Sequence, residues 1–255
     1  MSERLENYTI AEGYELPSKG LIYKEEVNKN IELRSMTGRD ELKRLSNSNT
    51  PFKALSDIIE GCMIEKPKIH VYDMCLGDYE FLLHKLRVIS YGPEYKISAI
   101  CPLCGNVIDS SIDLDTLEVK DFNMEEFDAI RTFTLPKTGK EITIKFQTPR
   151  MLDKISSEAK ELSRKHKDSE TDFNTLVTLT NAIESIDGNK VEPFKLEAFI
   201  NQLPVKDFNT IRNHIDKLND YVGLDTRFTL TCSSCGGEIP QRFRIGSEFF
   251  RPVEG

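Results

Sequence analysis

Hydrophobic positions along this chain change their spacing twice. Residues 31–36 alternate between apolar and polar side chains, which predicts a short strand. Apolar residues then recur at helical spacing in two segments, one beginning at Thr50-Pro51 and one covering about residues 78–90. Strand patterns, then helical patterns, then strand patterns again indicate an α+β fold rather than a parallel α/β fold.

Two pairs of predicted strands each flank a Cys-x-x-Cys sequence, so each pair predicts a β-hairpin with two cysteines in its turn. These four strands cover residues 95–100, 107–114, 227–231 and 238–245. A further hairpin is expected from residues 131–135 and 141–146, because the intervening Pro-Lys-Thr-Gly sequence has the chemistry of a turn.

Beyond Pro149 the period of the apolar residues is close to 3.6, which predicts helices. Gly188 and Pro204 mark breaks between them, since glycine commonly ends a helix and proline cannot continue one. The predicted helices cover about residues 150–166, 172–186, 194–203 and 206–219.

Composition restricts the functional classes. The 255 residues are 38% hydrophobic, enough for a core, and carry a formal net charge of -8, which disfavours a nucleic-acid partner. The N-terminal sequence lacks the apolar segment of a signal peptide, and no apolar stretch is long enough for a membrane helix. We therefore expect a cytosolic protein without a membrane partner, whose cysteines stay reduced.

The four cysteines of the two hairpin turns have the spacing of zinc ligands. A Cys-x-x-Cys turn supplies two thiolates, and the glycine after each pair lets backbone amides point at the sulfurs. Two such turns complete a tetrahedral Cys₄ site, which is closed to water and substrate and therefore structural. We predict one structural zinc ion bound by Cys101, Cys104, Cys232 and Cys235.

Other states of these cysteines remain open: redox-active disulfides within each pair, half-sites completed by other subunits, or thiols without metal. If one site forms, the two hairpins are the halves of a split zinc ribbon, and the helical segment is an insertion between them. The predicted divisions are an extended N-terminal arm (1–30), an α+β domain with the first zinc knuckle (31–148), the helical insertion (149–222), and the second zinc-knuckle hairpin with a C-terminal tail (223–255).

Residues outside the cysteine turns offer little catalytic chemistry. The four histidines are scattered, and no nucleotide-binding or hydrolase motif is present, so we predict neither an enzyme nor a small-molecule substrate. The basic residues around Lys165 are better explained as cations at a helix C-terminus than as a phosphate site. Phe249 and Phe250 have two equally supported interpretations: they pack on the core, or they anchor a partner protein.

Three sequence blocks and their order resemble the T-even-type phage baseplate protein family, which includes a baseplate hub assembly protein of contractile-tailed phages. The blocks are LPSKGLIY at residues 16–23, RSMTGRDE at 34–41, and residues 76–92, which continue into the first cysteine turn. The resemblance implies a structural or assembly component of the baseplate hub region that binds other baseplate or tail proteins. It implies a place in the host cytoplasm during assembly or in the virion tail baseplate. The alternative hypothesis is a nucleic-acid-binding zinc-ribbon protein.

Overall fold

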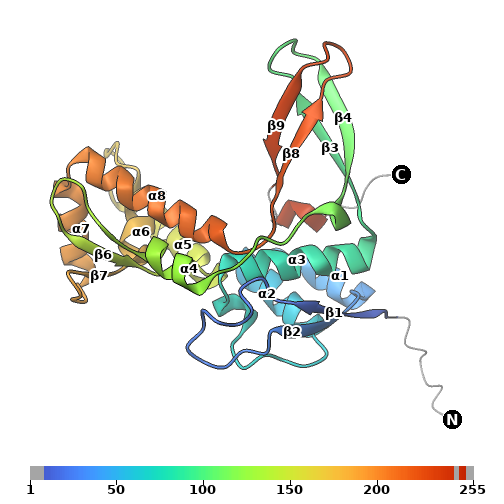
Figure 1. Cartoon of the computed structure of the whole chain (residues 1–255), viewed down its shortest axis with the longest axis horizontal. Coiled ribbons are helices and arrows are strands. Elements are labelled where there is room, and N and C mark those ends of the chain that lie inside the picture. Colours follow the sequence, from blue (N-terminus) through green and yellow to red (C-terminus); the bar gives the residue numbers. More distant parts are fainter. Residues whose placement is uncertain (1–8, 244–246, 251–255) are drawn as a thin grey trace.

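A computed structural model of the chain describes residues 9–243 and 247–250, which form a base, a helical lobe and a projecting arm (Figure 1). The expected α+β class is confirmed, since the strands form small antiparallel sheets beside helices. Residues 1–8, 244–246 and 251–255 lie outside the described part. The start of the predicted N-terminal arm (1–30) and the end of the predicted C-terminal tail therefore lie outside it as well.

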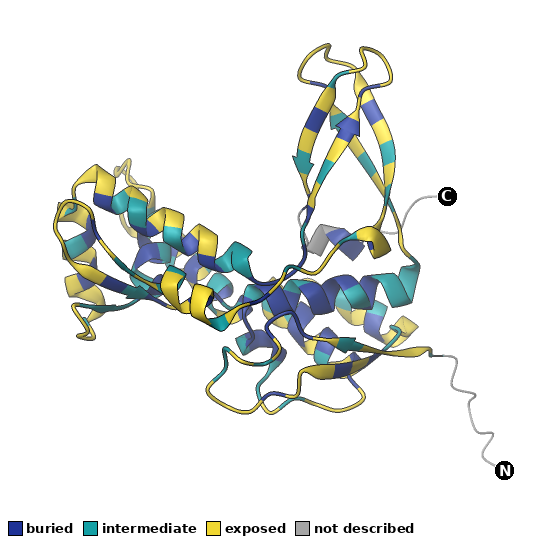
Figure 2. Ribbon diagram, viewed as in Figure 1, coloured by how far each residue is buried: buried dark blue, intermediate teal, exposed yellow. Residues whose placement is uncertain are grey.

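The base is built on two long helices covered by a two-stranded ribbon. Its elements are β1 (Ala11–Glu15), β2 (Asn30–Arg34), α1 (Gly38–Arg44), α2 (Pro51–Cys62), η1 (Val71–Asp73) and α3 (Leu76–Tyr91). Helix α2 starts where the Thr50-Pro51 signal predicts. Leu33 of β2, Ile59 of α2 and Leu82 of α3 are fully buried in one core, and Figure 2 shows buried residues concentrated along α2 and α3.

Residues 9–30 belong to the base, contrary to the expectation of an arm with little regular structure. β1 pairs with β2 in an antiparallel register that places Gly13 opposite Glu32. In the turn after β1, Leu16 is buried in the core and Ser18 is fully buried. Tertiary contacts therefore hold this segment, and a local turn pattern does not reveal them.

The helical lobe has a core of its own. It comprises α4 (Met124–Arg131), β5 (Thr132–Thr134), β6 (Glu141–Ile144), α5 (Pro149–Lys165), α6 (Phe173–Ala182), β7 (Ile183–Ile186), α7 (Pro193–Gln202) and α8 (Val205–Tyr221). Phe127 and Ile142 share this core with Leu179 and Leu218. The packed unit therefore begins upstream of residue 149, the expected start of the helical insertion.

One local prediction within the lobe is wrong, and one helix was not predicted. The helix expected over 172–186 ends at Ala182, because residues 183–186 pair with β6 as strand β7. Asp187 and Gly188 then turn the chain with positive φ angles of 49° and 73°. Helix α4 was not expected, although Asn123 provides a clear start by accepting hydrogen bonds from the N–H groups of residues 125 and 126.

Side chains from the lobe fix it to the base. The carboxylate of Asp153 in α5 accepts hydrogen bonds from the backbone N–H of Lys53 at 2.9 Å and the hydroxyl of Tyr72 at 2.9 Å. Gly77 at the start of α3 lies against the end of the lobe, where an added Cβ would be 2.3 Å from the carbonyl oxygen of Val222. Only glycine fits this close approach of two backbones.

The arm consists of the two predicted hairpins, which project together from the base (Figure 1). They are β3 (Glu94–Ile100) with β4 (Val107–Asp113), and β8 (Arg227–Thr231) with β9 (Glu238–Arg242). Two short helices, η2 (Leu114–Thr116) and η3 (Ser247–Phe250), lie where the arm joins the base. The strand–turn–strand predictions around both cysteine pairs are confirmed.

Candidate metal centre at the tip of the arm

The two cysteine turns fold in the same way. In the first, the N–H of Gly105 donates to the carbonyl of Cys101 at 2.8 Å, and in the second the N–H of Gly236 donates to the carbonyl of Cys232 at 2.8 Å. The two glycines have φ angles of 76° and 71°, in the left-handed region that side chains disfavour. The Cys-x-x-Cys-Gly sequence therefore produces two matching turns.

The structure brings all four predicted ligands together. The sulfur of Cys101 lies 3.8 Å from that of Cys235, and the sulfur of Cys104 lies 3.7 Å from that of Cys232. All four sulfur atoms lie within 4.8 Å of one another. A disulfide needs about 2.05 Å between sulfurs, whereas a tetrahedral thiolate site with bonds of about 2.3 Å has edges of about 3.8 Å. The arrangement is thus compatible with a metal site, and the cysteines are free thiols.

Backbone amides of the turns create a favourable environment for thiolates. The N–H groups of Cys235 and Ser234 lower the pKa of Cys232 to about 6. The N–H of Asn106 acts to lower the pKa of Cys104, but desolvation and the neighbouring sulfurs raise it to about 12. One thiolate is therefore stabilised by the turn, and further thiolates need a cation to offset their mutual repulsion.

A very small apolar cluster supports the cysteines. Cys101 and Cys232 are buried with Ile108 of β4 and Ile239 of β9, while Cys104 and Cys235 are exposed. Figure 2 shows few buried residues in the arm compared with α3. Because so little apolar surface joins the ends of the two hairpins, a metal ion would supply much of their attachment.

The remaining cysteines, Cys62 and Cys75, are placed for packing. Cys62 is fully buried in the core of the base, and Cys75 is buried in the lobe core, where its sulfur accepts a hydrogen bond from the N–H of Asp78 at the start of α3. Burial raises the pKa of Cys62 to about 11, so this thiol stays protonated at neutral pH.

The base of the arm contains a group of residues that the sequence analysis did not identify. The buried guanidinium of Arg87 in α3 donates to the carbonyl oxygens of Gly92 at 2.5 Å and Glu94 at 3.2 Å. It also lies 5.1 Å from the ring centre of Tyr91 and 5.9 Å from that of Phe249. Arg87 therefore fixes the turn that joins α3 to the arm, a role without a sequence motif.

Both phenylalanines of the C-terminal segment lie inside the chain's own core. Phe249 and Phe250 have exposed fractions of 0% and 1%. The ring centre of Phe249 lies 5.4 Å from that of Tyr95 in β3 and 5.1 Å from that of Phe243, which follows β9. Of the two interpretations that the sequence left open, the structure supports packing, because buried rings offer no surface to a partner.

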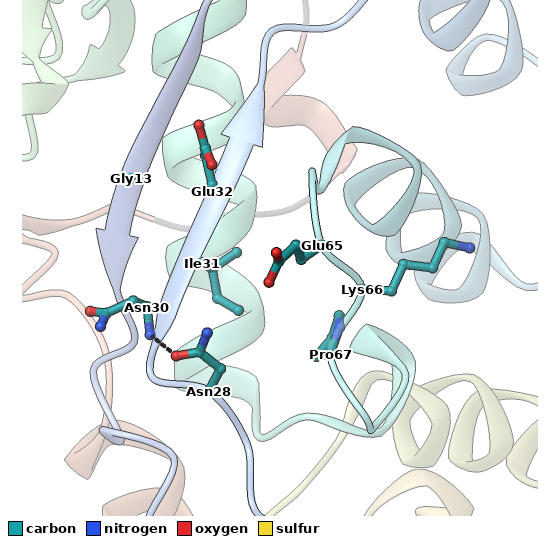
Figure 3. A pocket seen from close by; sticks show the side chains of 8 residues that line it. All are labelled: Gly13, Asn28, Asn30, Ile31, Glu32, Glu65, Lys66 and Pro67. Atoms are coloured by element: carbon teal, nitrogen blue, oxygen red, sulfur yellow. Dashed lines mark hydrogen bonds between the residues drawn. The ribbon is translucent and has the colours of Figure 1, made fainter.

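Among the described residues, His84 lies in the core and one surface cleft lies beside the β1–β2 ribbon. His84 is fully buried and its Nε2 lies 3.0 Å from the carbonyl of Leu114, which indicates a packing role. A cleft of about 420 Å³ borders β2 and the loop after α2 (Figure 3). Its lining includes no cysteine, serine or histidine. The lining residues are Gly13, Asn28, Asn30, Ile31, Glu32, Glu65, Lys66 and Pro67.

The arginines of the second hairpin are engaged within the chain. Arg242 forms an ion pair with Asp220, and Arg227 pairs with Asp225 at 2.5 Å. The first hairpin carries exposed carboxylates at Asp109 and Asp113. The arm therefore presents mixed charge rather than the basic face that phosphate binding requires.

The fold and the site define a three-part α+β protein in which two hairpins from distant parts of the chain meet at four cysteines. The chain belongs to the T4 bacteriophage base plate protein family, whose model matches residues 14–251. The resemblance carried by the three sequence blocks is thereby confirmed at the level of the family, which identifies a component of the phage tail baseplate. No curated protein and no solved structure matches the chain. Each helix in the described ranges is too short or too polar for a bilayer crossing.

Proposed function

We propose that this chain is a structural or assembly component of the hub region of a contractile phage tail baseplate. It acts through contacts with other baseplate or tail proteins and catalyses no reaction. The observation that carries this proposal is the family match over residues 14–251. The three-part shape supports it, because a base with a lobe and an arm presents separate surfaces to several neighbours (Figure 1).

We also propose that the four cysteines bind one zinc ion. Four soft thiolate donors in a tetrahedral arrangement suit zinc, and a closed Cys₄ site has a structural role. Cys101 and Cys104 would hold the ion from the first hairpin, and Cys232 and Cys235 from the second. The bound ion supplies a link between two hairpins that share only a small core.

The tip of the arm offers a contact surface beside this centre. Ile100, Leu103 and Val107 are 73%, 70% and 59% exposed, although all three are apolar. Exposed apolar residues that gather at the end of a projecting element commonly mark a protein-binding surface. A zinc ion that fixes the two turns would hold this surface in one shape, which lowers the entropic cost of binding.

Complementation of a phage that lacks this gene tests the proposal. Wild-type chain supplied in trans should restore infectious tails, and the chain should be found in assembling hubs made in the host cytoplasm or in mature baseplates. Mass spectrometry of purified assembly intermediates and mature particles distinguishes those two places. Normal tails without the chain would contradict the proposal.

Electrophoresis with duplex and single-stranded DNA tests the alternative function. Since the arm lacks a basic face, we expect no mobility shift at physiological salt. A salt-dependent shift that charge reversal at Arg242 removes would favour the nucleic-acid-binding alternative.

A further inference from the structure

One edge of the β1–β2 ribbon has no partner strand among residues 9–243 and 247–250. The N–H of Leu16 donates to the carbonyl of Lys29, and the N–H of Ser35 donates to the carbonyl of Ile10. Given the antiparallel register, the even-numbered residues of β1 therefore direct their backbone groups toward β2. The N–H and C=O groups of Ala11, Gly13 and Glu15 point away from it.

These outward backbone groups are accessible. Ala11, Gly13 and Glu15 are exposed, and no hydrogen bond from the described residues reaches their N–H groups. In Figure 3, Gly13 lies on the marginal strand, with β2 and the loop of Glu65 on the same side of it. The opposite side of β1 is the open edge of the sheet.

β1 lacks several of the features that commonly prevent edge pairing. Its register with β2 is continuous, without a bulge, and its sequence contains neither proline nor lysine. Strand β9 of the arm shows the contrast. Pro240 stands opposite Thr229, and the hydrogen bond from the N–H of Cys232 to the carbonyl of Gly237 fixes the register so that residue 240 faces outward. Proline therefore blocks the outer edge of β9 but not that of β1.

The charged groups around the edge are mainly acidic, although the ammonium of Lys85 lies 5.6 Å from the ring centre of Tyr14. Glu12 and Glu15 belong to β1, and Asp115 is close enough to act electrostatically on Tyr14. Lys29 offsets one of these charges by pairing with Glu15 at 3.0 Å. A strand that carries lysine or arginine would be attracted here, whereas a second copy of β1 would bring the same carboxylates and be repelled.

We propose that the outer edge of β1 binds an extended, lysine- or arginine-bearing segment of another baseplate protein as an additional β-strand. This inference rests on the proposed function, which supplies the class of partner. Main-chain hydrogen bonds to Ala11, Gly13 and Glu15 give the affinity, and the carboxylates around the edge select a basic segment. Gly13 leaves the centre of the edge without a side chain, which permits close approach.

Two substitutions at Gly13 distinguish a role of the outer edge in binding from a role of Gly13 in folding. Gly13 does not have a positive φ angle, and an added Cβ meets no atom within 4 Å, so Gly13→Ala retains both the strand and the outward N–H. Gly13→Pro removes that outward donor without breaking a hydrogen bond to β2, because this N–H is not used to pair with β2. The two free variants should have matching melting temperatures and zinc contents.

The test supplies wild type, Gly13→Ala or Gly13→Pro to a phage that lacks the gene and measures the chain in isolated baseplate assemblies. We expect wild type and Gly13→Ala to be incorporated equally and Gly13→Pro at least about tenfold less, with slowed amide exchange at residues 11–15 in the assembly. Glu12→Lys should also reduce incorporation.

Each other outcome overturns the inference in a distinct way. Equal incorporation of the proline and alanine variants shows that the edge is not used, while the baseplate function stands. Absence of wild-type chain from every assembly removes the proposed function and the partner class with it. A wild-type dimer in sedimentation that Gly13→Pro abolishes shows that the edge pairs with a second copy instead.

Discussion

The carboxylate of Asp78 accepts two hydrogen bonds from Ser18, one from its backbone N–H at 2.9 Å and one from its hydroxyl at 2.5 Å. The hydroxyl of Tyr23 donates to the same carboxylate at 2.6 Å. These contacts join the sequence block at residues 16–23 to the block that forms α3. Two of the segments that carry the family resemblance are therefore neighbours in space, and their shared polar network fixes the first turn of the base to its central helix.

Replacing Asp78 with alanine should lower the free energy of unfolding by about 3 kcal/mol. The substitution leaves the buried N–H and hydroxyl of Ser18 without this acceptor and leaves the hydroxyl of Tyr23 with only a long contact of 3.5 Å to the sulfur of Cys75, which costs more than the hydrogen bonds themselves. Urea denaturation measures the change. Asp128→Ala, at an exposed position of α4, is the matched control and should be nearly neutral. A similar small effect at Asp78 would show that the network does not hold the turn.

Removing the metal should loosen the arm and leave the rest folded. The turns that carry the four cysteines join β3 to β4 and β8 to β9 at the end of the arm, away from the base and the lobe (Figure 1). This placement predicts a local effect rather than loss of the whole fold. In Cys101→Ser, hydrogen exchange should quicken in β3, β4, β8 and β9 and remain unchanged in α2 and α3.

Elemental analysis completes that test. Purified wild type should carry about one zinc ion per chain, and Cys101→Ser should lose it. Cys62→Ala is the control, since Cys62 lies in the core of the base and should retain the zinc while losing some packing energy. Zinc content unaffected by substitution of all four candidate ligands would rule out the site.

Truncation of Phe249 to alanine should destabilise the protein by about 3–5 kcal/mol, the range for a buried phenylalanine. Its ring contacts Tyr95 and Phe243 where the two hairpins join the base, so the loss creates a cavity at that junction. Phe194→Ala is the matched control, because Phe194 is largely exposed on α7. Equal denaturation midpoints for the two variants would restore the interpretation of Phe249 as a partner anchor.

Local patterns were sufficient to predict the cysteine turns. A Cys-x-x-Cys-Gly sequence between alternating strands specifies a turn almost completely, because glycine alone favours the positive φ that Gly105 and Gly236 adopt. That the two turns meet in space was inferred from chemistry, because a zinc site needs four ligands and each turn supplies two. The structure places all four sulfurs within 4.8 Å of one another. The identity of the ion stays a prediction.

Long-range packing set the limit of prediction elsewhere. Residues 183–186 continue the apolar pattern of α6, yet β6 recruits them as a strand, an outcome that only the partner strand determines. The sequence around Leu16 and Ser18 is that of an ordinary surface turn, but both residues are buried in the folded chain. Arg87 could not be identified as a structural residue, because its acceptors are backbone carbonyls, which every sequence contains.

Glu80 of α3 provides a pH-dependent prediction at the base of the second hairpin. Burial raises the pKa of its carboxyl to about 7, although Arg242 and Lys120 oppose the shift and Asp220 adds to it. The folded chain therefore holds this proton in a range where the unfolded chain, with a glutamate pKa near ~4.3, has released it. Stability contributed by the protonated form is greatest at low pH and is lost as the pH rises toward 7.

Comparing wild type with Glu80→Gln isolates this effect. The glutamine should remove the desolvation cost, so the variant should be more stable than wild type by roughly 3 kcal/mol at pH 8, with the difference shrinking toward zero near pH 4.5. The comparison is needed because buried His84, whose pKa is lowered to about 4, gives an opposite trend below pH 6.5 in both proteins. Urea denaturation at several pH values measures the difference, and a constant offset across that range would show that Glu80 does not hold the proton.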